Sequence, residues 1–452
     1  MTPHSPHLQP HLIERCVVRM KKMNVVLAVL SAFFVDAYAQ DGSFLNRFGY
    51  SISLQNVNRF DSNVLRLSSP TSDLALGLYP AVTIRYLIQQ PTVVEAGYVF
   101  GWDSYTASKF LSTNSHHFFM AVIHSLKPGL GITLLGSLVH SNQPDVLNQR
   151  SLYSIASFDQ FREGIGMRMA VSTSTLLSLE YSIYQRMYDR LFVSVQDKQR
   201  NWQQRLGLQV FHVFSQGTMG GANVGLIVDN SNNPAYKYVE PFLRIYFSHS
   251  IGGGFRMQLS DEIGGLLFSN RPVSNNIARS RRDLINSLSI GLEKPISPYL
   301  VIYGRYYLQR DFSNEPLRNF IDHSVNFGFR ISFDKAVDIH GSNGTSSSFD
   351  DLSGNEVSPV NKAAVTMTNL GYEYLTKRLY EQSLAYSLTA ISLDSTIAQA
   401  HINAGIAYYK KGDLGKAIAQ WKIALSQDPH NAKLADLVQK AVHEKGAANS
   451  DH

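Results

Sequence analysis

The residues best suited to chemistry in this chain are Arg and Glu side chains that recur at every second position of alternating segments. Because successive side chains of a strand point to opposite faces, this spacing puts them on one face. The main candidates are Arg85, Glu95, Arg168, Glu180, Arg244, Arg256, Arg305 and Arg330, accompanied by Arg186, Arg205, Glu240 and Glu293. Every cation in the set is arginine, which forms planar, two-pronged ion pairs with carboxylates. Two interpretations stay open: a structural network of ion pairs that stabilises the strands, or an arginine excess that attracts anionic solutes.

Other chemistry is weakly supported. His116, His117, His124 and His140 lie on neighbouring segments, but adjacent His116 and His117 point to opposite faces, which disfavours a metal site. Gly252, Gly253 and Gly254 precede an alternating segment and no Lys-Ser/Thr pair follows, so they do not form a phosphate loop. A barrel-embedded hydrolase would need Ser, His and an acid together, and no spacing singles them out. We therefore predict no enzyme activity, no cofactor and no metal.

The alternating segments that carry these residues have connections of two kinds. Short turns are expected at 89–92, 125–129, 172–175, 215–218, 249–251 and 294–297. Long connections are expected at 58–75, 104–114, 142–160, 187–203, 229–237, 261–284 and 311–322, and the basic residues Arg271, Arg279, Arg281 and Arg282 fall in the longest. Short periplasmic turns alternating with longer outer loops are typical of a transmembrane barrel with an even strand number. The pattern predicts an antiparallel barrel of roughly fourteen strands.

Composition agrees with this architecture. Charged residues make up 17% of the chain, and the aromatic residues are 23 Tyr and 24 Phe against 3 Trp. A low charged fraction suits a barrel, in which every second strand residue meets lipid, and excludes a protein that spans the membrane with helices. The net charge of +6 is spread along the chain, so nucleic acid is not an expected partner. The final alternating segment ends on Phe333 and thereby resembles the signal read by the outer-membrane assembly machinery.

The N-terminus has the order of a secretory signal peptide. Lys21 and Lys22 precede an apolar run over 25–35, and Ala37, Tyr38 and Ala39 supply a small-x-small cleavage site. We assign residues 1–39 to this extension and signal peptide and residues 40–334 to the barrel. The one cysteine, Cys16, lies upstream of the apolar run, so the mature chain is expected to hold no thiol.

The C-terminal part changes from period 2 to period 3.6 after a polar linker over 335–361. Two segments 34 residues apart follow, and the second carries Ala404, Gly405, Tyr408, Ala417, Trp421, Ala424 and Pro429. These residues resemble the tetratricopeptide-repeat (TPR) signature. The first segment keeps Leu370, Gly371, Tyr374 and Ala390 but has Ser383 and Ser387 at packing positions. We expect a small all-α domain over 362–445, with two repeats and a capping helix.

The TPR resemblance implies a protein-binding groove lined by the first helix of each repeat. The candidates are Tyr372, Gln399, Ile402, Ile406 and Tyr409, with Val365, Thr368 and Leu375. Such a groove suits a helix or an extended segment of a partner, although the same face could simply pack on a neighbour. Repeat arrays usually need about three repeats for stability. The first repeat is therefore expected to dock on the barrel turns, a second copy of the chain, or a partner protein.

Together these features predict a Gram-negative outer-membrane barrel, surrounded by outer-membrane lipid, with a periplasmic TPR module. Its expected role is a channel or a secretion and assembly component whose TPR module recruits a protein partner. The alternative is a non-conducting scaffold of a secretion-type complex. The lumen separates the two, because an open, arginine-lined lumen supports transport and a filled lumen supports the scaffold.

Overall fold

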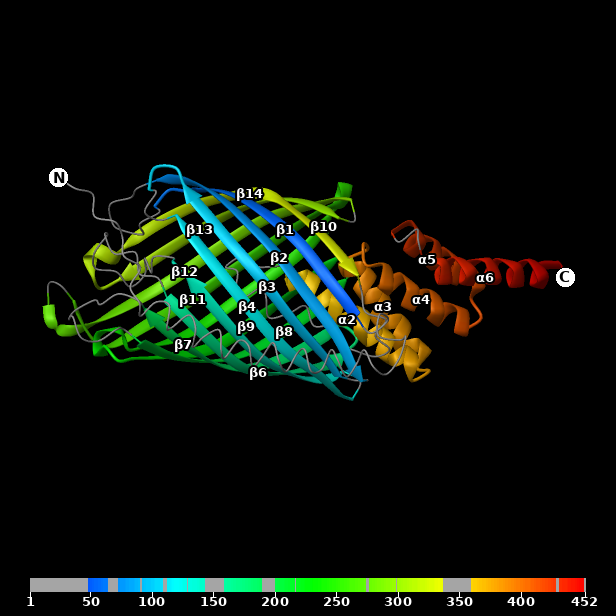
Figure 1. The fold of residues 1–452 in the computed structure, drawn as a ribbon, viewed down its shortest axis with the longest axis horizontal. Coiled ribbons are helices and arrows are strands. Elements are labelled where there is room, and N and C mark those ends of the chain that lie inside the picture. Colours follow the sequence, from blue (N-terminus) through cyan, green and yellow to red (C-terminus); the bar gives the residue numbers. More distant parts are fainter. Residues whose placement is uncertain are drawn as a thin grey trace, which may run out of the picture. The chain divides into compact units, whose positions relative to one another are not determined.

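The computed structural model describes residues 48–63, 72–89, 92–108, 112–127, 129–142, 158–188, 200–215, 217–273, 276–297, 299–335, 359–427 and 431–450. The predicted signal peptide and most of the predicted linker, residues 336–358, lie outside these ranges. Fourteen antiparallel strands form one closed barrel, which confirms the predicted fold (Figure 1). The strands are β1 (Phe48–Asp61), β2 (Asp73–Gln89), β3 (Thr92–Tyr105), β4 (Thr113–Lys127), β5 (Leu130–Ser141), β6 (Phe158–Ser172), β7 (Thr175–Tyr188), β8 (Arg200–Ser215), β9 (Thr218–Ser231), β10 (Tyr238–Ile251), β11 (Phe255–Val273), β12 (Asn276–Ser297), β13 (Leu300–Ser313) and β14 (Phe320–Lys335).

The barrel closes between its first and last strands. β1 and β14 pair antiparallel from Tyr50↔Lys335 to Asp61↔Ser324, so neither strand leaves a free edge. Closure satisfies the backbone hydrogen bonds that lipid cannot satisfy, which is why barrels can span membranes. Alternation then fixes two faces: on β6 the exposed side chains include Ile165, Met167 and Met169, and the residues between them face inward. Exposed apolar side chains mark the outward face of other strands in the same way, for example Leu206 and Leu208 on β8.

Short turns alternate with longer connections as predicted, with two corrections. The expected long loop over 261–284 is wrong, because β11 and β12 pair across most of it, with Asp261↔Leu288 and Leu267↔Arg282 as register partners. Polar residues on both faces gave this segment the composition of a loop. On the strands these polar side chains find charged and aromatic partners. Arg281 pairs with Asp283, and its guanidinium lies 5.1 Å from the Phe268 ring centre. The short turns after β10 and β12 also fall up to three residues later than expected.

Five helices follow the barrel: α2 (Pro359–Thr376), α3 (Tyr380–Leu393), α4 (Ala398–Lys410), α5 (Leu414–Gln427) and α6 (Ala432–Ser450). They confirm the predicted all-α module, with α2 and α3 as the first repeat, α4 and α5 as the second, and α6 after them. In the second repeat, Trp421 is buried and its indole donates to the Ile402 carbonyl at 3.2 Å. The indole packs so closely on Gly405 that a Cβ at this position would stand 2.2 Å from Trp421 Nε1. Among the described residues, no helix has the length and apolar character needed to cross a membrane.

Candidate functional site

The predicted charged residues lie on the inward face of the barrel strands. On β2, for example, Val82 and Ile84 are exposed outward, so Arg85 faces inward. Arg85 and Glu95 are register partners on β2 and β3, and their Nε and Oε2 atoms are 2.5 Å apart. The Glu95 side chain is fully buried, so the pair neutralises a carboxylate that would otherwise be costly to bury.

Three more inward arginines also meet acids. Arg244 pairs with Glu262 across β10 and β11, and Arg305 lies 3.6 Å from Glu293. The fully buried Arg162 side chain pairs with Glu180. Neither Arg162 nor Glu262 is among the residues singled out from the sequence. Alternation with Ile165 and Met167 could have found Arg162, whereas Glu262 lies in the segment for which the sequence predicts a loop.

Two inward arginines reach the C-terminal helices. Arg168 on β6 donates from Nη1 to the Thr366 hydroxyl of α2 at 2.9 Å, and Arg256 on β11 donates to the backbone carbonyl of Leu393 at the end of α3. The last main candidate, Arg330 on β14, lies between its register partners Gln55 and Val301. Six inward arginines are thus engaged by acids or by the helices: Arg85, Arg162, Arg168, Arg244, Arg256 and Arg305.

An apolar cluster joins the barrel to α2 and α3 at the end of the barrel that carries the short turns. Its barrel members are inward-facing residues near those turns: Leu176, Phe211, Met219 and Tyr246. Its helical members include Ala363, Ala364, Met367, Leu370, Tyr386, Ala390 and Leu393. Met367 and Ala364 have no exposed surface. The first repeat therefore completes its core on the barrel, the first of the three docking alternatives expected from its incomplete packing.

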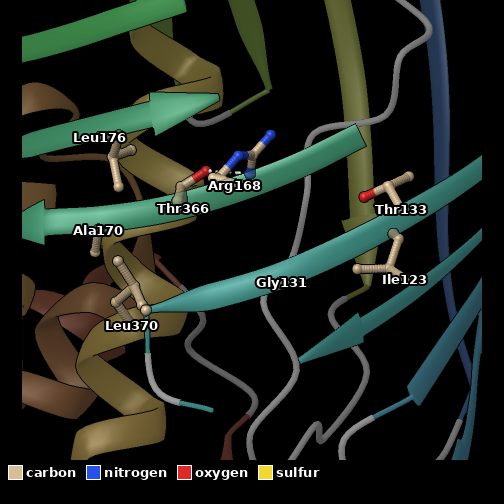
Figure 2. Close-up of a pocket in the computed structure, with 9 residues that line it drawn as sticks. Ile123, Gly131, Thr133, Arg168, Ala170, Leu176, Thr366 and Leu370 are labelled. Carbon is tan, nitrogen blue, oxygen red and sulfur yellow. Dashed lines mark hydrogen bonds between the residues drawn. The ribbon is translucent and has the colours of Figure 1, made fainter. Parts of the chain in front are cut away.

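The contact between α2 and the strands encloses a small pocket (Figure 2). It is lined by Ile123, Gly129, Gly131, Thr133, Arg168, Ala170, Leu176, Thr366 and Leu370. In Figure 2, Arg168 lies beside Thr366, while Leu370 faces the barrel strands. Apart from Arg168 and two threonines, the lining is apolar. α2 therefore packs on the strands through apolar side chains, and the Arg168–Thr366 hydrogen bond adds a polar tether.

A second polar tether involves a carboxylate. Glu373 of α2 is buried, and its Oε1 accepts a hydrogen bond from the Ser125 hydroxyl at 3.1 Å. Burial raises the pKa of the Glu373 carboxyl above its ordinary value, while the bond from Ser125 and the charge of Lys377 act in the opposite direction. A raised pKa means that the docked carboxyl binds its proton more tightly than the released one does.

Docking of α2 should therefore depend on pH. It should be strongest below the ordinary carboxyl pKa and weaken as pH rises through the raised pKa of Glu373. Pulsed electron paramagnetic resonance between spin labels at Ser172 and Thr376 would measure this, since the described chain holds no cysteine. We expect the distance distribution to broaden as pH rises. Glu373→Gln, which cannot ionise, should keep it narrow at every pH; an equal broadening in this variant would contradict the assignment to Glu373.

The predicted groove residues are largely used inside the helical module. Ile402, Ile406 and Tyr409 pack against the cluster formed by α5 and α6, and the Tyr409 hydroxyl donates to the Glu444 carboxylate of α6 at 2.8 Å. Gln399 donates to Asn403 within α4. Tyr372 lies half-buried on α2. The face that would hold a partner in a longer array is thus partly covered by α6.

The histidines do not form a metal site in the part of the chain that the structure describes, where no group of three or more His, Cys, Asp or Glu residues is placed to hold a metal ion. His116 bonds to the Tyr98 hydroxyl on the outward face at 2.8 Å, whereas His117 is buried on the inward face.

One known family matches part of the C-terminal helical module. The family described as tetratricopeptide repeat matches residues 398–431. Comparison with curated proteins finds no match. Among solved structures, an anion-selective porin from Comamonas acidovorans aligns with 63% of this chain and 99% of its own, at 9% identity and a TM-score of 0.36. A loop L8 deletion mutant of OmpT, an outer membrane protein of Vibrio cholerae, covers the same shares at 7% identity and a TM-score of 0.40. The P. putida toluene transporter TodX aligns with 67% of this chain and 92% of its own, at 9% identity and 0.36. These values are too low to relate the chains in function.

Proposed function

We propose that this protein is an outer-membrane anchor for a protein-interaction module, with a barrel whose short-turn mouth is closed at rest by its own helix α2. In this arrangement the barrel is a non-conducting scaffold and the TPR module lies in the periplasm. The single observation that carries the proposal is the apolar cluster shared by Met367 and Leu370 of α2 with Leu176 and Met219 of the barrel.

Two features of this contact support a closed mouth. The contact is apolar, with Leu370 of α2 beside Leu176 and Ala170 of the barrel, so α2 would have to expose apolar surface to leave. The tethers from Arg168, Arg256 and Ser125 come from three different strands and hold two helices. Polar bonds in such a contact fix its geometry, because a buried donor or acceptor left unsatisfied is costly.

The pairing of the inward arginines also favours a scaffold over an open anion pathway. Arg85, Arg162 and Arg244 each face a carboxylate, which offsets their charge locally. An anion channel remains the second candidate function. It is favoured by the arginine content of the inward face, and it would require α2 to leave the mouth first.

Recruitment of a protein partner is proposed for the second repeat and α6. The first repeat packs on the barrel, whereas Trp421, Leu434 and Val438 form a separate core of α5 and α6. A partner bound there would be held at a fixed place beneath the barrel. This assignment rests on the TPR match over 398–431.

Membrane topology gives the proposal a direct test. Epitope tags inserted between Val273 and Asn276, or between residues 143 and 157, should be accessible to antibody on intact cells. A tag after His452 should become accessible only after the outer membrane is permeabilised, because short turns and helices share one side. The reverse pattern would place the TPR module outside the cell and contradict the proposed anchor.

A further inference from the structure

Three histidines near the short turns share one arrangement. His124 on β4, His212 on β8 and His249 on β10 each stand opposite a threonine that is the first residue of the neighbouring strand: Thr92, Thr175 and Thr218. The threonine Oγ1 and the histidine Nδ1 are 2.9, 2.9 and 2.8 Å apart, respectively. We call these three pairs the histidine collar.

The collar lies on the outward, apolar face of the barrel. Two residues beyond each histidine, toward the turn, is an exposed apolar side chain: Leu126 at 52%, Phe214 at 63% and Ile251 at 41%. Two residues before them lie Val122, Val210 and Phe247, also outward. Each ring is itself half-buried. Every collar histidine is thus a polar group set between apolar neighbours on the surface that faces lipid.

The geometry leaves one ring nitrogen for an outside partner. Because Nδ1 is hydrogen-bonded to the threonine Oγ1, the second ring nitrogen, Nε2, points away from the threonine. When the threonine hydroxyl donates to Nδ1, the neutral ring carries its proton on Nε2, which is then a donor. A donor in hydrocarbon without a partner costs several kcal/mol, so such a group belongs at the level of lipid headgroups, where acceptor oxygens are present.

Charge at the same end of the barrel favours an anionic acceptor. Lys294, on β12 near its short turn, lies with Nζ 4.6 Å from the Phe255 ring centre, and Lys127 is exposed at the end of β4. At the opposite end the outward histidines have different partners: His140 bonds to the Asp159 carboxylate at 2.9 Å, and His323 bonds to the Tyr306 hydroxyl at 2.7 Å. The threonine pairing is thus a feature of the collar.

We propose that the histidine collar binds the phosphate groups of phospholipids in the leaflet at the short-turn side. His124, His212 and His249 each donate from Nε2 to a phosphate oxygen, and Thr92, Thr175 and Thr218 set the orientation of the rings. The three contacts, spread from β4 to β10, fix the depth of this side of the barrel in the bilayer. The inference rests on the membrane placement proposed above, and it is independent of whether α2 closes the mouth.

The test is solid-state nuclear magnetic resonance on the full chain, with histidine labelled with ¹⁵N and reconstituted into phosphatidylethanolamine and phosphatidylglycerol bilayers. Dephasing of the Nε2 signals by lipid ³¹P reports close approach to phosphate. We expect clear dephasing in the wild type, and loss of most of it in the His124→Leu/His212→Leu/His249→Leu variant. The matched variant at the opposite end, with His116, His140 and His323 changed to Leu, should retain it.

A second variant separates binding from folding. Thr92→Val/Thr175→Val/Thr218→Val keeps all three histidines but removes their hydrogen-bond partners, so dephasing should fall while the barrel still shows the heat-dependent migration of a folded barrel on gels. Unchanged dephasing after loss of the three histidines would overturn the proposal. So would dephasing by ¹³C-labelled lipid ester carbonyls in place of ³¹P. If α2 remains docked in these variants, a failure of the collar leaves the proposed anchor function standing.

Discussion

Replacing Met367 by Glu should release α2 from the barrel. Met367 has no exposed surface and lies in the cluster that joins α2 to Leu176, Phe211 and Met219. A carboxylate there would be surrounded by apolar side chains, and burying a charge without a partner costs several kcal/mol. α2 can avoid that cost by leaving the barrel, while the strands stay paired with one another. We therefore expect α2 to undock and the strands to remain folded.

Hydrogen–deuterium exchange measures this release directly. Peptides from α2 should exchange much faster in Met367→Glu than in the wild type, and strand peptides should be unchanged. Met367→Leu is the matched control, because volume-conserving apolar swaps usually cost less than about 1.5 kcal/mol. Equal protection of α2 in the Glu variant and the wild type would mean that the cluster does not hold the helix.

Replacing Trp421 by Ala should unfold the second repeat. The Trp421 side chain is 1% exposed, packs against Tyr409 with ring centres 5.7 Å apart, and fills the space beside Gly405. Truncating a buried aromatic side chain to Ala typically costs about 3–5 kcal/mol, which is a large part of the stability of a small domain. The helical core of α4, α5 and α6 should therefore lose its cooperative transition.

Circular dichroism of the full chain would follow this loss as a drop in helical signal and in the temperature at which it melts. Ile423→Ala serves as control, since Ile423 lies on the same helix with 41% of its surface exposed. The barrel should retain its heat-dependent migration in both variants. If Trp421→Ala melts like Ile423→Ala, the second repeat does not depend on the core described here.

The barrel was predictable because lipid on one face and a polar interior on the other impose period 2 on the sequence. On β14, Val325, Phe327 and Phe333 are exposed outward, as the alternation of that segment predicts. The β11–β12 hairpin was not predictable in this way. Beyond the apolar belt both faces are polar, and residues such as Arg271 and Arg281 are satisfied by stacking and ion pairing that leave no periodic signal.

For the candidate site, too, the sequence predicts one part and not the other. Alternation assigns a face to each inward arginine, but its partner depends on strand register and on tertiary contacts. Arg168 contacts Thr366, which is 198 residues away in sequence, and no local pattern connects the two. The need of the first repeat for a docking surface follows from its small buried residues Ser383 and Ser387. Which surface it uses is decided by shape and by the tethers at Ser125 and Arg256.

Electrical conductance across a planar lipid bilayer would show whether the protein closes its own barrel. Full-length wild-type protein should show no steady ion conductance, because we propose that α2 closes the short-turn mouth. Met367→Glu, inserted under the same conditions, should conduct steadily once α2 has left. A steady conductance of the same size in the wild type and the variant would contradict the account and would establish an open channel instead.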